Sequence, residues 1–196
     1  TIESQSIGST ISNEMRSNAV KALIVACIFM LFYIWFRFKD IRFAGSAIIA
    51  LVHDVLVMLT GYALIRISVG NTFIACILTI VGYSINDTIV IFDRIRENMQ
   101  GMKKQTPETL AEVANRSLTQ TLSRSLNTSI TTIIMVLLLF ILGVSSIREF
   151  ALPLMIGLIS GTYSSIFIAA ALWYVMKLHL GKDKLLKPAV AKTKKK

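Results

Sequence analysis

The sequence contains few charged residues, few prolines and only two cysteines. Charged residues make up 16% of the 196 residues, against roughly 25% in ordinary soluble domains, whereas apolar residues make up 54%. This composition, with a mean hydropathy of +0.66, argues against a free-standing soluble enzyme and against a disordered protein. Three prolines and ten glycines exclude a collagen-like chain or a linker. Cys27 and Cys76 each lie in an apolar run, which predicts two small buried side chains and neither a disulfide nor a metal site.

Long apolar runs occupy most of the sequence. Because a membrane-spanning helix needs about 20 mostly apolar residues, five of these runs qualify as spans. The sequence therefore predicts an all-α fold, a polytopic helical membrane bundle with five transmembrane helices. The predicted spans cover residues 19–36, 43–65, 72–92, 127–143 and 150–176.

Lysine and arginine are concentrated in three of the segments outside these spans. Residues 37–42 contain three of the 21 basic residues, residues 93–125 contain six, and the tail from Lys177 contains eight. In a five-span chain these segments lie on one side, and the positive-inside rule makes that side cytoplasmic. The N-terminus is then outside and the C-terminus is cytoplasmic.

This pattern predicts three parts. Residues 1–17 are polar and contain no hydrophobic signal core, so we expect an earlier span upstream and interpret them as the end of a truncated external domain. Residues 18–180 form the transmembrane bundle with a cytoplasmic loop at 93–125, and residues 181–196 form a basic cytoplasmic tail. Within the loop, Thr-Pro at 106–107 is a typical helix start, and the apolar spacing after it predicts an amphipathic helix that continues into the fourth span.

Two aspartates lie inside predicted spans, where an ionisable side chain is costly and is therefore a candidate functional residue. Asp54 follows His53 in the second span, about 16 Å from the cytoplasmic end and near the midplane. Asp87 follows Asn86 in the third span, about 8 Å from the cytoplasmic end. His53 and Asn86 are candidate supporting groups for the aspartates that follow them.

Two more polar residues precede Asp87 by one helical turn. Tyr83 and Ser84 stand at the i−4 and i−3 positions, so we expect the three polar side chains to share one face of the helix. This strip would place supporting hydroxyl groups beside the carboxylate.

Each of these charged groups has a structural interpretation and a functional one. Asp87 is either a carboxylate satisfied by a neighbouring helix or a proton carrier, because the protonation of a buried carboxyl group depends on whether a cation is close. Arg124, at the start of the fourth span, is the candidate cation, with an interface anchor as its alternative. For His53 and Asp54, a self-satisfied structural pair is favoured over a functional role.

Other motifs have local interpretations. Asp93, Arg94 and Arg96 end the third span, where ion pairs between residues three or four apart, such as Asp93 with Arg96, would satisfy them. Gly157 and Gly161 form a GxxxG pattern, which predicts close helix packing in the fifth span.

Five segments carry a family resemblance. They are WFRFKDIRFA (35–44), LVHDV (51–55), VGYSINDTIVIFDRIRENM (81–99), NRSLTQTLSRSLNTSITT (115–132) and GLISGTYSSIFIAAALW (157–173). In order and spacing they resemble the SecF family. Its members are the smaller subunit, or C-terminal half, of the bacterial SecD–SecF protein-export complex, in the resistance–nodulation–division-like superfamily.

The resemblance implies six spans with a periplasmic domain between the first two, of which this chain contains the last five spans and the end of that domain. It implies a multi-pass protein of the bacterial inner (cytoplasmic) membrane that uses the proton-motive force, with a SecD partner, to promote preprotein translocation through the Sec channel. It also places essential charges on Asp87 and Arg124, with a further essential acid supplied by SecD.

The implied partners are SecD, the SecY-SecE-SecG channel, YidC, the preprotein and the lipid bilayer. The resemblance implies no enzymatic activity and no cofactor apart from the coupling proton, for which Na⁺ is the alternative. The basic residues follow the sidedness of the spans without interleaved aromatic residues, so nucleic-acid binding is not expected.

Three other functions stay open at this point. A membrane aspartyl protease that uses Asp54 and Asp87 is disfavoured by their different depths and by their sequence contexts. A related proton-coupled exporter of lipids or drugs would share the acidic spans but not the residues at 81–99. A structural subunit without its own proton path is compatible with the same sequence.

Overall fold

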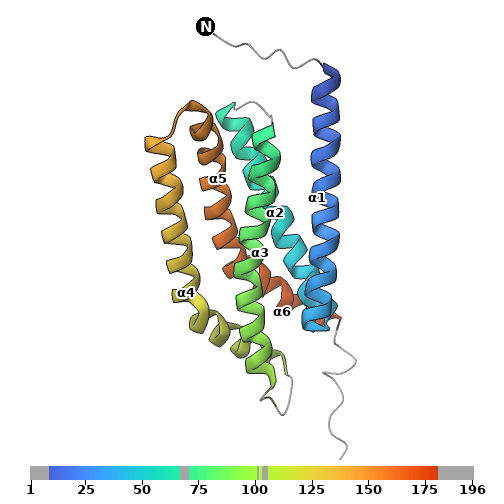
Figure 1. Ribbon diagram of the computed structural model, residues 1–196. Coiled ribbons are helices and arrows are strands. Elements are labelled where there is room, and N and C mark those ends of the chain that lie inside the picture. Colours follow the sequence, from blue (N-terminus) through green and yellow to red (C-terminus); the bar gives the residue numbers. More distant parts are fainter. Residues whose placement is uncertain (1–8, 67–70, 101, 103–105, 181–196) are drawn as a thin grey trace, which may run out of the picture.

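The computed structural model describes residues 9–66, 71–100, 102 and 106–180, and this part of the chain is helical apart from short connections (Figure 1). The elements are α1 (Ser9–Phe38), α2 (Ile41–Ile65), α3 (Asn71–Gln100), α4 (Pro107–Leu142), α5 (Ser145–Tyr163), the π-helical segment η1 (Ser164–Ala169) and α6 (Ala170–His179). Because α5, η1 and α6 are continuous, the described residues contain five helices long and apolar enough to cross a membrane. The predicted all-α membrane bundle with five spans is confirmed.

The third, fourth and fifth helices are longer than the predicted spans. α3 continues beyond residue 92 to Gln100, and the fifth span begins at Ser145, before residue 150. α4 is one helix from its start to Leu142, which confirms the amphipathic helix predicted to join the fourth span. The side chains of Thr106 and Thr109 form a reciprocal capping box that satisfies the first backbone N–H groups of α4.

The turn between α1 and α2 is shorter than predicted. Only Lys39 and Asp40 separate the two helices, and Lys39 has a left-handed backbone conformation with φ of 54°. The Asp40 side chain accepts a hydrogen bond of 3.1 Å from the backbone N–H of Arg42 and so caps α2. The predictions for residues 1–8 and 181–196 lie outside the described residues.

The centre of the bundle is formed by α2, α3 and the fifth span, with α1 and α4 on opposite sides (Figure 1). The most apolar window of the first span is 6% buried, whereas that of the fifth is 56% buried. Phe43 stacks on Trp173 with ring centroids 5.2 Å apart and meets Phe92 edge-on at 4.9 Å, which joins α2, α6 and α3. Cys76 is buried, as predicted, whereas Cys27 is only half-buried, and both are free thiols among the described residues.

The two glycines of the GxxxG pattern bring α5 against α3. A Cβ atom added to Gly157 would overlap the side chain of Ile80, and one added to Gly161 would lie 3.1 Å from the Cβ of Ser84. The predicted close packing is confirmed, because a Cβ atom at either position would crowd a side chain of α3.

The described parts of the three basic segments meet at one end of the bundle, which we call the basic end. Arg37 at the end of α1 pairs with Asp93 near the end of α3, with 2.8 Å between their side-chain atoms. Lys177 in α6 lies 3.3 Å from Asp40 in the turn between α1 and α2. This agrees with the predicted grouping of the basic residues, whereas the side of the membrane on which they lie stays a prediction.

Candidate functional site: two buried carboxylates within the bundle

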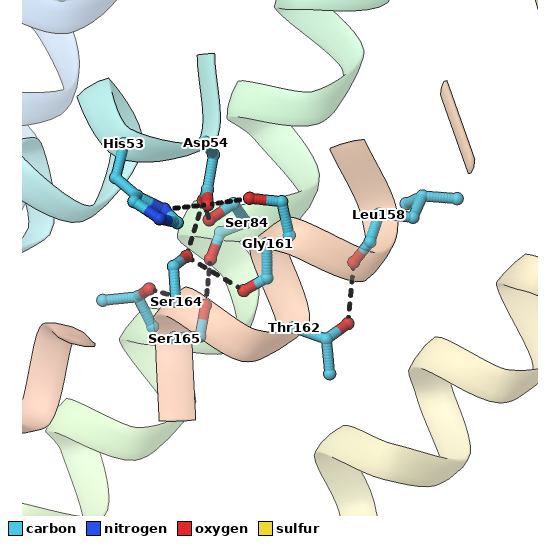
Figure 2. Close-up of polar contacts among 10 residues, drawn as sticks. His53, Asp54, Ser84, Leu158, Gly161, Thr162, Ser164 and Ser165 are labelled. Carbon is cyan, nitrogen blue, oxygen red and sulfur yellow. Dashed lines mark hydrogen bonds and ion pairs between the residues drawn. The ribbon is translucent and has the colours of Figure 1, made fainter. Parts of the chain in front are cut away.

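Asp54 lies where α2, α3 and α5 meet, and it is fully buried. Its Oδ2 atom accepts hydrogen bonds of 2.6 Å from the hydroxyls of both Ser84 and Ser164 (Figure 2). Its Oδ1 atom accepts one of 2.8 Å from the hydroxyl of Ser160. We call Ser84, Ser160 and Ser164 the serine cluster. A carboxylate can accept several hydrogen bonds, so the cluster satisfies Asp54 with neutral donors from two other spans.

His53 contributes less to Asp54 than the sequence predicts. Its Nδ1 atom lies 3.2 Å from Oδ1 of Asp54, and its side chain is 37% exposed. Its ring also faces Tyr163, with centroids 6.5 Å apart. The predicted pair of His53 with Asp54 is present, but the shorter hydrogen bonds to Asp54 come from serine hydroxyls that are distant in the sequence.

The serine cluster continues into contacts between α3 and η1. The Ser165 hydroxyl donates to the carbonyl oxygen of Ser84 at 3.1 Å and shares a hydrogen bond of 3.0 Å with the hydroxyl of Thr88 (Figure 2 shows the first of these contacts). Ser164 and Ser165 are the first residues of η1. The turn of α3 from Ser84 to Thr88 is thus held against a π-helical segment, a backbone form that is frequent at functional sites.

Asp87 lies on this same turn of α3 but is bonded differently. Its side chain is 4% exposed, and its Oδ2 atom is buried without a hydrogen-bond partner among the described residues. Ser84 precedes it by three residues, so Asp87 lies about 4.5 Å nearer the basic end than the level of the serine cluster. The difference in depth between the two aspartates is therefore about one helical turn.

Arg124 is the cation whose charge acts on Asp87. It lies on the exposed side of α4, and among the described residues Asp87 forms no ion pair within 4.0 Å. The structure thus brings the two predicted residues into electrostatic range without a contact ion pair.

The predicted polar strip on α3 holds only in part, because Ser84 faces other helices than Tyr83 does. Tyr83 points to α4 and donates a hydrogen bond of 3.1 Å to the Ser129 hydroxyl, which also accepts one of 2.7 Å from Thr162. Ser84 instead points to α2 and α5, while Asn86 is exposed. Consecutive residues on a helix are about 100° apart, so α3, packed between these helices, directs neighbouring side chains to different partners.

Comparisons with known proteins identify the family. A family model described as protein export membrane protein SecD/SecF, C-terminal, matches residues 1–179. The chain belongs to this family. It is 48% identical over 172 residues to the protein translocase subunit SecF of Alicyclobacillus acidocaldarius, covering 88% of this chain and 56% of that protein. It is also 44% identical to the protein translocase subunit SecDF of Bacillus subtilis, covering 87% of this chain and 23% of the relative.

A solved structure agrees with this assignment. The crystal structure of SecDF from Thermus thermophilus, described as a translocon-associated membrane protein, matches with a TM-score of 0.79 and 45% identity over 87% of this chain and 23% of that one. The chain thus spans about half the length of the SecF relative, at 56%, and about a quarter of the SecDF proteins, at 23%. It is a SecF-type chain of a multi-pass membrane protein.

The motif residues at the end of α3 form an ion-pair corner in this SecF-type chain. The prediction that Asp93 pairs with Arg96 is wrong, because Asp93 pairs with Arg37 of α1. Arg96 donates a hydrogen bond of 3.1 Å to the backbone carbonyl of Arg37, which fastens the same two helices. Arg94 does form a local pair, 2.6 Å from Glu97 three residues later. The corner is at the basic end and holds α1 to α3.

The sequence interpretation missed Ser160 and Ser164 as partners of Asp54. They are four residues apart and therefore lie on one helical face, beside the glycines that bring α5 against α3. A pair of hydroxyls next to a GxxxG pattern is a signal that could have indicated a buried acceptor on a neighbouring span.

Proposed function

We propose that this SecF-type chain is part of a protein-export complex of the bacterial inner membrane. Together with a SecD-type partner, it uses the proton-motive force to promote the translocation of preproteins through the SecY-SecE-SecG channel, with YidC as a further partner. The basic end faces the cytoplasm. The chain acts without enzymatic chemistry, and its coupling ion is the proton, with Na⁺ as the alternative.

The observation that carries this proposal is that Asp87 is buried with an oxygen that has no hydrogen-bond partner among the described residues. A buried carboxyl group with one unpartnered oxygen and a cation at a distance is suited to taking up and releasing a proton, because little bonding has to be broken. Each proton that crosses about 100 mV supplies about 2.3 kcal/mol. Protonation removes the attraction between Asp87 and Arg124, so that α3 can repack against α4 and transmit the change.

The need for a SecD-type partner is supported by the outer surface of α3. Thr79, Gly82 and Asn86 are exposed at spacings of three and four residues, which places them on one face within a candidate span. No atom lies within 4 Å of a Cβ built on Gly82. Small and polar side chains are typical of helix interfaces in membranes, so a helix of the partner is proposed to cover this face.

The experiment uses the full-length protein with its SecD-type partner in inverted membrane vesicles. The Asp87→Asn variant should lose the stimulation of preprotein export by the proton-motive force while still co-purifying with the partner. Ser46→Ala is the matched control, since the Ser46 hydroxyl is bonded to backbone carbonyls of its own helix. Normal stimulation in the Asp87→Asn variant would contradict the proposal.

A structural subunit is the second candidate, and the serine cluster favours it. The bonds to Asp54 join three spans and require no proton transfer. In that case, variants of the serine cluster would reduce assembly with the partner, and Asp87→Asn would leave export unchanged.

A further inference from the structure

The register between α3 and α4 places Asp87 opposite a particular residue. The two helices are antiparallel, and the Tyr83 hydroxyl donates to Ser129. Toward the basic end, Nδ2 of Asn98 donates to the hydroxyl of Ser117 at 2.8 Å, so the same faces stay in contact. Asp87 follows Tyr83 by four residues, which is about one helical turn. Because the helices are antiparallel, the position opposite Asp87 lies four residues before Ser129 on α4.

The residue at that position on α4 is Ser125. It is 1% exposed, and its hydroxyl is buried without a hydrogen-bond partner in the described part of the chain, as is Oδ2 of Asp87. By this register the two residues lie at the same level of one interface, and among the described residues both polar atoms lack a partner. Buried polar groups are satisfied in nearly all native proteins, and where the protein does not supply the partner, an ordered water does.

Other hydroxyls on the same face of α4 do not share this property. The buried residues Ser117, Thr121 and Ser129 all take part in hydrogen bonds within the protein. Thr121, for example, donates to the carbonyl of Ser117 at 2.9 Å. Within this face of α4, Ser125 is thus the hydroxyl available to a ligand.

We propose that Asp87 and Ser125 together hold a water molecule between α3 and α4, and that this water delivers the proton to Asp87. The inference rests on the proposed function and adds the group that serves Asp87. The Ser125 hydroxyl bonds the water, and the water faces Oδ2 of Asp87. When the water is protonated as hydronium, it gives one proton to Oδ2 and becomes neutral water again, and the reverse transfer releases the proton. Ser125 is a positioning residue, and Arg124 beside it keeps a positive charge near the carboxylate.

The test uses the full-length protein with its SecD-type partner in vesicles and compares substitutions at Ser125. Ser125→Val fills the position with an apolar group and excludes the water, whereas Ser125→Thr keeps the hydroxyl. We expect proton-driven export to fall at least about tenfold in Ser125→Val, which corresponds to about 1.4 kcal/mol in the barrier, and to be retained in Ser125→Thr. Ser46→Ala, which also removes one buried hydroxyl, should behave as the wild type.

A spectroscopic measurement separates this role from a merely structural one. The infrared carbonyl band of protonated Asp87, assigned by its loss in Asp87→Asn, should move to higher wavenumber in Ser125→Val and keep its place in Ser125→Thr. If Ser125→Val does not accumulate in the membrane, Ser125→Ala is measured instead, with shifts expected in the same direction.

Two results would overturn the water site. One is an unchanged band and normal export in Ser125→Val, and the other is equal impairment in Ser125→Thr and Ser125→Val. Either would leave the proposed function standing as long as Asp87→Asn abolishes stimulation. Normal export in Asp87→Asn would instead contradict the proposed function itself.

Discussion

Asp54 and Asp87 are two buried carboxylates about one helical turn apart in depth, and their surroundings are opposite in kind. Asp54 accepts hydrogen bonds from three serine hydroxyls on two other spans and lies beside His53. Asp87 has an unpartnered Oδ2 atom and a cation within electrostatic range. A carboxylate that is fully bonded joins helices, whereas one that is not can change its protonation at little structural cost. Burial alone therefore does not identify the functional acid.

The largest expected effect is a difference in stability between the matched variants Asp54→Asn and Asp87→Asn. Asp54→Asn replaces an accepting oxygen with an NH₂ group that faces serine hydroxyls, so it should lower the free energy of unfolding by about 2–3 kcal/mol. Asp87→Asn breaks no bond to Oδ2 and should change it by less than about 1 kcal/mol. Unfolding of the purified chain in detergent micelles measures both. Equal losses of unfolding free energy in the two variants would contradict the proposed difference between Asp54 and Asp87.

A smaller effect is expected from removing one donor of the serine cluster. Ser160→Ala deletes the hydrogen bond to Oδ1 of Asp54 and should cost about 1.5 kcal/mol, because a bond to a carboxylate is lost. Its control is Ser46→Ala, whose hydroxyl bonds only to carbonyls of its own helix and whose loss should cost less than about 0.5 kcal/mol. Detergent unfolding again provides the measurement, and a Ser160→Ala variant as stable as Ser46→Ala would contradict the role of the cluster.

The close approach of α5 to α3 predicts a further decrease in stability. In Gly161→Ala, the new Cβ atom would lie 3.1 Å from the Cβ of Ser84 and push its hydroxyl away from Asp54, at a cost of about 1 kcal/mol. Gly82→Ala meets open space in this chain and should be neutral or stabilising, since alanine favours helix by up to about 1 kcal/mol. The thermal unfolding midpoint of Gly161→Ala should therefore fall below that of the wild type, whereas that of Gly82→Ala should stay the same or rise. Equal midpoints in the two variants would contradict the close approach at Gly161.

The smallest effect is expected outside the buried region. Arg37→Gln removes the pair with Asp93, in which both side chains are partly exposed, and should cost only about 0.2–1 kcal/mol. The cost should decrease further in concentrated salt, because exposed charges are screened. A loss as large as that of Asp54→Asn would show that the ion-pair corner, and not the serine cluster, holds the bundle together.

The features that could be predicted from the sequence are those with local causes. Apolar run length was sufficient for the five spans, and the aspartates stood out as ionisable residues within them. The partners of Asp54 could not be predicted, because Ser160 and Ser164 are 106 and 110 residues away and their approach depends on how the spans pack. For the same reason Asp93 pairs with Arg37, 56 residues away, and not with the nearby Arg96.

The central claim is that Asp87 takes up a proton, and infrared difference spectroscopy of the full-length protein with its partner tests it most directly. On acidification of wild-type vesicles, a carbonyl band of a protonated carboxylic acid should appear, should persist in Asp54→Asn and should be absent in Asp87→Asn. A band that persists in Asp87→Asn and is lost in Asp54→Asn would contradict the account, because Asp54 would then be the proton carrier.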